Sequence, residues 1–190
     1  MVYIILGVIA FGCLYIFDIS KIYQKWGKWP NIFFGLGFLI LALVTGLLIY
    51  RGWDNIRHFS WLFLLLSLLG GLFMLYALFF ALPFKKTYVK GDNRKVVDTG
   101  VYSLCRHPGV LGFFVFYLGL WLALLTKELF GALIIWTLMD IIHVWVQDRF
   151  IFPKSLNNYR QYVCTTPFLI PTRQSWLNFW AELKRKRFRA

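Results

Sequence analysis

The chain has 190 residues, enough for one domain rather than two. Apolar residues make up 59% of it, and its mean hydropathy is +0.63, whereas a soluble globular domain has roughly 45–50% apolar residues. A net charge of +13 suggests nucleic-acid binding at first sight. The basic residues, however, fall between and after long apolar runs, where they indicate orientation in a membrane and contact with anionic lipid headgroups. We therefore expect membrane lipids and no nucleic acid as partners.

Five apolar runs predict membrane-spanning helices, since about 20 residues are needed to cross roughly 30 Å of hydrocarbon. They cover residues 1–17, 31–50, 59–83, 108–126 and 129–146. The first run lacks a basic start and a small-residue cleavage site, so we expect a retained helix rather than a signal peptide. The sequence predicts an all-α, polytopic membrane protein, with residues 1–190 forming a single transmembrane domain.

Local signals add detail to two of these runs. Gly70 and Gly71 in the third run predict a kink or a close helix contact. Pro108 begins the fourth run, which suits the first turn of a helix. The three cysteines, Cys13, Cys105 and Cys164, show no metal-ligand spacing, and we expect no metal site.

The distribution of lysine and arginine predicts the orientation of the bundle. Alternate connections between the five runs carry eighteen basic residues on one side and three on the other. The positive-inside rule then places the N-terminus outside the cell and the basic loops in the cytoplasm. Short loops and small size favour the bacterial inner membrane over the endoplasmic reticulum.

The fifth run is the only one with ionisable residues inside it. Asp140, His143 and Gln147 share one side of a 3.6-residue helix, and Thr137 joins them. An ionisable side chain at membrane depth costs at least about 2.5–3.5 kcal/mol. The stripe therefore predicts a polar cleft open to the cytoplasm, or a structural hydrogen-bond network between helices.

Two cytoplasmic segments flank the last two runs. Residues 94–112 bring Arg106-His107-Pro108 to the start of a helix. Gly109 and Gly112 leave the first turn without bulky side chains, so that backbone can approach a ligand. The backbone amides at a helix start favour an anion. Residues 147–171 have the apolar and tyrosine content of an amphipathic segment that lies on the membrane surface and folds back over the helix ends. Together the two segments predict a site at the cytoplasmic end of the bundle.

These segments resemble the integral membrane methyltransferase superfamily, which includes isoprenylcysteine carboxyl methyltransferases and phospholipid N-methyltransferases. The first segment offers Thr99-Gly100-Val101-Tyr102, Arg106-His107-Pro108 and Gly112. The second offers Gln147-Asp148-Arg149, Tyr159, Tyr162, Pro167 and Pro171. The resemblance covers residues 94–171. Gln147 and Asp148 stand where the family has paired glutamates, Val110 stands for a frequent tyrosine, and His143 stands for a substrate-contacting arginine.

The resemblance implies S-adenosylmethionine as methyl donor, bound between the two cytoplasmic segments without a metal. It implies cofactor contacts from Arg94, Lys95, Val96, Val97, Tyr102, Arg106, His107, Pro108, Gly109, Val110, Gln147 and Tyr159. His107 is expected to hold the methionine carboxylate, and Tyr102 and Tyr159 are expected to pack on adenine or ribose.

The expected acceptor is a lipophilic small molecule or a lipidated group that enters between helices. Its polar end is expected near the candidate catalytic residues His143, Asp148 and Arg149. A carboxylate acceptor needs a cation to steer it, whereas an amine needs a base such as Asp140 or Asp148. The sequence leaves both chemistries open. Two other functions also stay open: an NADPH-dependent sterol-reductase-like enzyme, and a non-catalytic membrane scaffold of the same fold.

Overall fold

The structure is a computed structural model, and it describes residues 1–23, 29–81 and 96–187. Within these ranges every regular element is a helix and no strand occurs. The expected all-α fold class is therefore confirmed for the part of the chain that is described. Two of the candidate cofactor residues, Arg94 and Lys95, lie outside the described residues.

Five long helices form the body of the structure: α1 (Val2–Tyr23), α2 (Pro30–Gly52), α3 (Ser60–Leu75), α5 (Pro108–Leu124) and α6 (Lys127–Val146). Two π-helical turns extend α3 and α6, namely η2 (Tyr76–Phe80) and η4 (Gln147–Ile151). Shorter elements are η1 (Trp53–Asn55), η3 (Gly100–Ser103), α7 (Phe152–Ser155) and α8 (Tyr159–Thr165), and the chain ends with α9 (Arg173–Arg187).

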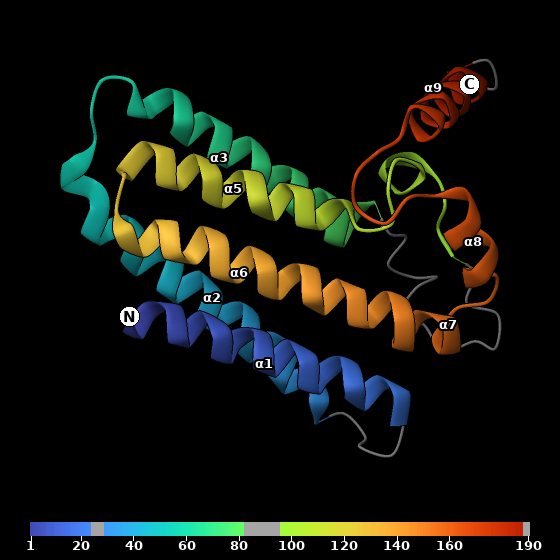
Figure 1. The fold of residues 1–190 in the computed structure, drawn as a ribbon, viewed down its shortest axis with the longest axis horizontal. Coiled ribbons are helices and arrows are strands. Elements are labelled where there is room, and N and C mark those ends of the chain that lie inside the picture. The colour runs from blue at the N-terminus through green and yellow to red at the C-terminus, as the bar shows by residue number, and fades with distance from the viewer. Residues whose placement is uncertain (24–28, 82–95, 188–190) are drawn as a thin grey trace.

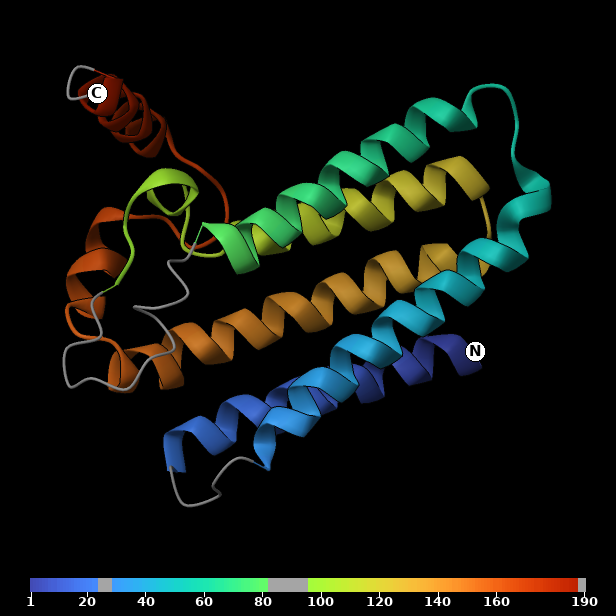
Figure 2. The ribbon, with the colours of Figure 1, turned by 180° about the vertical axis from the view of Figure 1, so that it is seen from behind.

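Consecutive long helices run in opposite directions and lie side by side (Figure 1). Helix α3 lies along α5, and α6 lies between α5 and α1, while α2 lies behind α1 in Figure 1 and crosses in front of it in the reverse view of Figure 2. The N-terminus lies at one end of the bundle, whereas α7, α8 and α9 lie at the other. The residues that follow α6 therefore meet the start of α5 at a single end.

Four helical stretches are long and apolar enough to cross a membrane: Val2–Ser20, Pro30–Asn55, Ser60–Phe80 and Lys127–Ser155. Helix α5 is apolar but has only 17 residues. Large apolar side chains point outward, such as Leu43 at 60% and Leu62 at 65% exposure. Such an apolar outer surface fits a protein surrounded by lipid.

Helices α1 and α6 extend beyond the predicted runs where polar residues begin, whereas α5 ends at Leu124, two residues before its predicted end. Helix α1 continues from the predicted end at residue 17 to Tyr23, and α6 begins two residues before 129 and leads into η4 and α7. Hydropathy falls when charged residues appear, but the backbone hydrogen bonds of a helix can continue through the polar membrane surface. The extension of α1 brings Asp18 into the helix.

Glycines allow α3 and α5 to approach closely. A Cβ atom on Gly70 would lie 2.6 Å from the backbone nitrogen of Phe116, and one on Gly112 would lie 2.7 Å from that of Met74. The close helix contact expected at Gly70 is therefore present. The interpretation of Gly112 is corrected, because its bare face is filled by α3 rather than open to a ligand.

The core lies where α1, α2, α5 and α6 meet. Trp136 and Phe11 are almost fully buried there, and the Trp136 ring donates a hydrogen bond of 3.1 Å to the Ile4 carbonyl. Thr45 and Tyr117 share a hydrogen bond of 2.6 Å between their hydroxyls. These buried polar groups of Trp136, Thr45 and Tyr117 are thus paired across helices, which stabilises one arrangement of the bundle.

Candidate functional site

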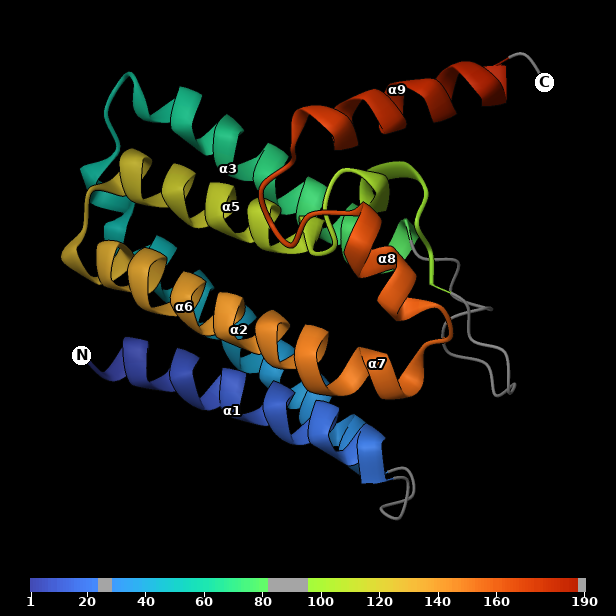
Figure 3. The ribbon, with the colours of Figure 1, turned by 45° about the vertical axis from the view of Figure 1, so that its right-hand side comes forward.

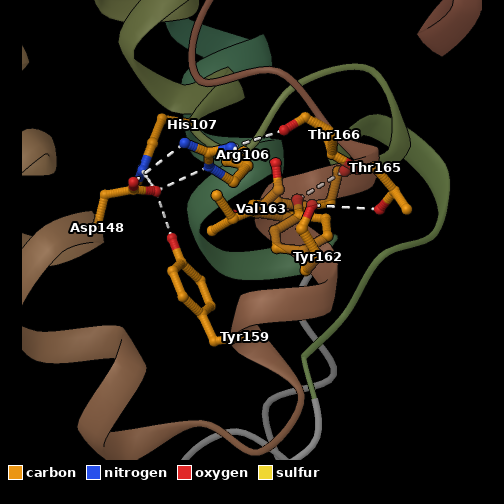
Figure 4. A network of polar contacts seen from close by, with 9 residues as sticks. Arg106, His107, Asp148, Tyr159, Tyr162, Val163, Thr165 and Thr166 are labelled. Carbon is orange, nitrogen blue, oxygen red and sulfur yellow. Dashed lines mark hydrogen bonds and ion pairs between the residues drawn. The ribbon is translucent and has the colours of Figure 1, made fainter.

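Asp148 on η4 is the centre of a polar network at the end of the bundle (Figure 4). Its two carboxylate oxygens accept hydrogen bonds from Arg106 Nε at 2.8 Å and Nη2 at 3.0 Å. His107 Nε2 lies 3.3 Å from Oδ1, and the Tyr159 hydroxyl donates to the same oxygen at 2.5 Å. The loop before α5 and the segment that runs from η4 to α8 are thereby joined at one carboxylate.

Arg106 also fixes the chain after α8. Its Nη1 donates to the carbonyls of Thr166 at 2.7 Å and Val163 at 3.2 Å, and its backbone NH donates to the Pro167 carbonyl at 2.9 Å. Four guanidinium donors are thus used within the protein. The Arg106 side chain is only 9% exposed. Its role in this arrangement is to hold two segments together.

An aromatic enclosure surrounds His107. Phe152 stacks on the imidazole with ring centroids 6.0 Å apart, and Phe168 approaches edge-on at 5.1 Å. Burial lowers the pKa of His107, and this outweighs the opposite effect of the hydrogen bond to Asp148. His107 is therefore neutral near pH 7, when it donates Nε2–H to Asp148 and cannot act as a cation.

Two other groups in this region are also held uncharged. Burial and the hydrogen bond to Asp148 raise the pKa of the Tyr159 hydroxyl. Burial raises the pKa of the Cys105 thiol to about 11. A buried thiol of this kind is not a nucleophile at neutral pH.

Tyrosines attach the loop before α5 to its neighbours. The Tyr102 hydroxyl donates to the Ala77 carbonyl at 2.9 Å, and the Tyr102 carbonyl accepts from the Tyr162 hydroxyl at 2.7 Å. Gly100 has a φ of +62°, a conformation that favours glycine, and its NH donates to Glu182 on α9 at 3.0 Å. The loop is therefore held by contacts with η2, α8 and α9.

A second polar cluster lies deeper, between α1 and α6. Asp18 Oδ2 accepts hydrogen bonds from His143 Nε2 and Gln147 Nε2, both at 2.6 Å. Asp18 and His143 are buried, and the Tyr15 ring lies edge-on to the imidazole at 4.8 Å. Gln147 thus belongs to this cluster. Of the predicted polar stripe on α6, only His143 joins the cluster through a described hydrogen bond.

Asp18 was missed by the sequence reasoning, which ended the first helix at residue 17. The match in depth appears only from the observed helix starts, which differ from the predicted starts at residues 1 and 129. Asp18 follows Val2 by 16 residues and His143 follows Lys127 by 16, and α1 and α6 run in the same direction. Side chains at equal distances from such helix starts reach equal depths in the bundle.

The remaining candidate residues lie in different surroundings. Pro108 and Val110 are buried in the packing of α5, and Gly109 faces Leu78. Arg149 is exposed on η4. Val97 is half-buried in the loop before η3.

Val96 does line a surface pocket of about 390 Å³. The other lining residues are Asp98, Asn158, Gln161, Tyr162 and Thr165. This volume falls within the roughly 300–1,000 Å³ of small-molecule sites. Hydroxyl, amide and carboxylate groups there suit the ribose and amino groups of an adenosyl cofactor. Arg106 and His107, in contrast, are occupied by Asp148 and do not present a cation to a cofactor carboxylate.

Among the described residues no group of three histidine, cysteine or acidic side chains is placed to hold a metal ion. Comparisons of the chain with protein-family models, curated proteins and solved structures give no match.

Proposed function

We propose that the chain is an integral membrane methyltransferase that uses S-adenosylmethionine to methylate a lipophilic, membrane-embedded acceptor. The observation that carries this proposal is the Asp148 network. It joins the loop containing Arg106 and His107 to the segment after α6, and the motifs in these two segments are those that resemble the methyltransferase superfamily.

The proposed cofactor site is the pocket between residues 96–98 and α8, next to this network. Asp98, Asn158 and Gln161 would bind the ribose and amino groups, and Tyr162 would form the inner wall. Arg94 and Lys95 remain proposed contacts from the resemblance alone. S-adenosylmethionine supplies a methyl group already activated on a sulfonium, so the protein accelerates transfer chiefly by positioning.

The proposed acceptor site is the cluster of Asp18, His143 and Gln147. When His143 donates Nε2–H to Asp18, its Nδ1 carries the free lone pair and can accept a proton from an amine. This geometry favours the amine over the carboxylate alternative. We assign Asp148 a positioning role and not the role of a base. Its oxygens already form hydrogen bonds with Arg106, His107 and Tyr159.

The proposed topology has five spans, with α5 crossing the membrane beside α3 despite its 17 residues. The N-terminus would be outside, and α7 to α9 would lie in the cytoplasm of a bacterium. The excess of basic residues in alternate connections supports this orientation.

A second candidate is a non-catalytic membrane scaffold. The contacts of Arg106 and Asp148 favour the scaffold, because these side chains use their hydrogen-bonding groups within the protein and so serve a structural purpose without any ligand. A scaffold should bind neither S-adenosylmethionine nor NADPH, whereas a reductase should bind NADPH.

Transfer of label tests the proposed reaction. Membranes containing the protein are incubated with methyl-labelled S-adenosylmethionine, and lipids are then extracted into organic solvent. We expect label in the lipid extract with the wild-type protein and strongly reduced label with His143→Gln. Gln174→Ala, which changes an exposed residue of α9, is the control and should match wild type. Equal label in membranes with and without the protein would contradict the proposal.

A further inference from the structure

Helix α9 is attached to the bundle by one narrow face. Ser175 is 1% exposed, and Glu182, two turns further, accepts the hydrogen bond from Gly100. Thr172 and Ser175 exchange hydrogen bonds between their hydroxyls and each other's backbone NH, which fixes the start of the helix. The helix is thus a defined element docked on η3.

A second face of α9 is apolar and uncovered. Its residues recur at the spacing of one helical side, and they are large: Trp176, Leu177, Trp180 and Leu183. Their exposed fractions are 46%, 55%, 55% and 40%. The opposite side carries the polar residues Gln174 and Asn178. An uncovered apolar face of this kind indicates a surface that is buried in another medium or partner.

Charge indicates which partner covers this face. Arg173 precedes the apolar residues, and the sequence continues Lys184-Arg185-Lys186-Arg187 after them. Tryptophan is enriched at membrane–water interfaces, and basic residues beside an apolar helix face favour anionic lipid headgroups. The composition fits a helix lying in an anionic membrane surface.

The direction of α9 agrees with that location. In Figure 1 the long helices run across the view, whereas α9 is strongly foreshortened, so it runs at a steep angle to them. Figure 3 shows it projecting beside the bundle, at the end where α8 lies. With the long helices crossing a membrane, α9 lies along the membrane surface.

We propose that α9 is an interfacial membrane helix that inserts the Trp176, Leu177, Trp180 and Leu183 face into a leaflet containing anionic phospholipid. The Gly100–Glu182 hydrogen bond then ties the membrane surface to the loop that carries Arg106. This inference does not depend on the methyltransferase proposal.

Site-directed fluorescence in lipid nanodiscs tests the inference. In a Cys164→Ser background, which removes the exposed native thiol, Leu177→Cys places an environment-sensitive dye on the apolar face. Asn178→Cys places it on the polar face as the matched control. Brominated phosphatidylglycerol in phosphatidylcholine nanodiscs serves as the quencher. We expect quenching on the order of threefold stronger at position 177 than at 178, and weaker quenching when the brominated lipid is phosphatidylcholine alone.

Equal quenching at the two positions would overturn the proposal, as would no quenching at either. Blue-shifted but unquenched emission at position 177, together with a dimeric mass, would show that a second copy of the chain covers the face. Equal quenching at position 177 by brominated phosphatidylglycerol and by brominated phosphatidylcholine would overturn the proposed preference for anionic lipid.

Discussion

Arg106 and Asp148, 42 residues apart in the chain, form a two-point ion pair with contacts of 2.8 and 3.0 Å. Because a planar guanidinium matches both oxygens of a carboxylate, this pair fixes the orientation of each segment as well as their distance. His107 and Tyr159 bind the same carboxylate. The pair therefore determines the shape of the end of the bundle that carries the proposed cofactor site.

Arg106→Gln should destabilise the protein strongly. Removing one partner of a nearly buried ion pair leaves the Asp148 charge uncompensated, which costs about 3–5 kcal/mol. We expect the midpoint of thermal unfolding in detergent to fall by on the order of 10 °C. Arg149→Gln makes the same change at an exposed position and should leave the midpoint nearly unchanged. Similar midpoints for the two variants would refute the structural role of Arg106.

Asp18→Asn should weaken the contact between α1 and α6. The variant keeps the size of the side chain but removes the charge that accepts hydrogen bonds from both His143 and Gln147. A loss of about 1–3 kcal/mol is expected. Asp54→Asn, at an exposed position in η1, is the control. A cycle with His143→Gln should give a coupling energy above about 0.5 kcal/mol; strictly additive effects would show that the two side chains do not interact.

Stability should fall as the pH is lowered below the ordinary histidine range. Burial lowers the folded-state pKa of His107, whereas the unfolded-state value is about 6.5. Between the two values the unfolded chain binds more protons, so the free energy of unfolding decreases with decreasing pH. His107→Gln should flatten this slope in unfolding curves measured from pH 7.5 to 5. His58→Gln, which keeps His107 and alters an exposed histidine, should retain the wild-type slope.

Gly70→Ala should force α3 and α5 apart. The added Cβ would lie 2.6 Å from the Phe116 backbone nitrogen, and overpacking of this kind costs about 1–3 kcal/mol. Gly46→Ala adds the same methyl group where nothing lies within 4 Å, so it should be neutral or stabilising. The difference between the two unfolding midpoints measures the contact. Equal midpoints would mean that the two helices are not as closely packed as described.

The sequence was sufficient for the coarse fold because hydropathy and length determine which segments suit a membrane. It also predicted the helix start at Pro108 and the close contact at Gly70, since proline and glycine restrict local geometry directly. It did not reveal the partner of His143, because Asp18 lay just beyond the apolar run. Hydropathy reports where apolar residues end, not where the helix ends.

The candidate site was harder to predict than the fold. A motif gives residue types and spacing, but the partners of Asp148 depend on tertiary packing between segments 42 residues apart. Arg106 and His107 therefore looked available for a ligand in the sequence, and in the structure both are bound to Asp148. Asp98 and Asn158, which line the pocket, belong to no part of the motif.

The central claim is that the pocket beside this network binds S-adenosylmethionine, and calorimetric titration of the detergent-purified protein with S-adenosylhomocysteine tests it most directly. Asn158→Gly is the matched variant, because glycine accepts the positive φ of 63° at this position while removing the side chain from the pocket. We predict micromolar binding to the wild type, weaker binding to the variant and no binding of NADPH. Binding of NADPH alone, or of neither compound, would contradict the claim.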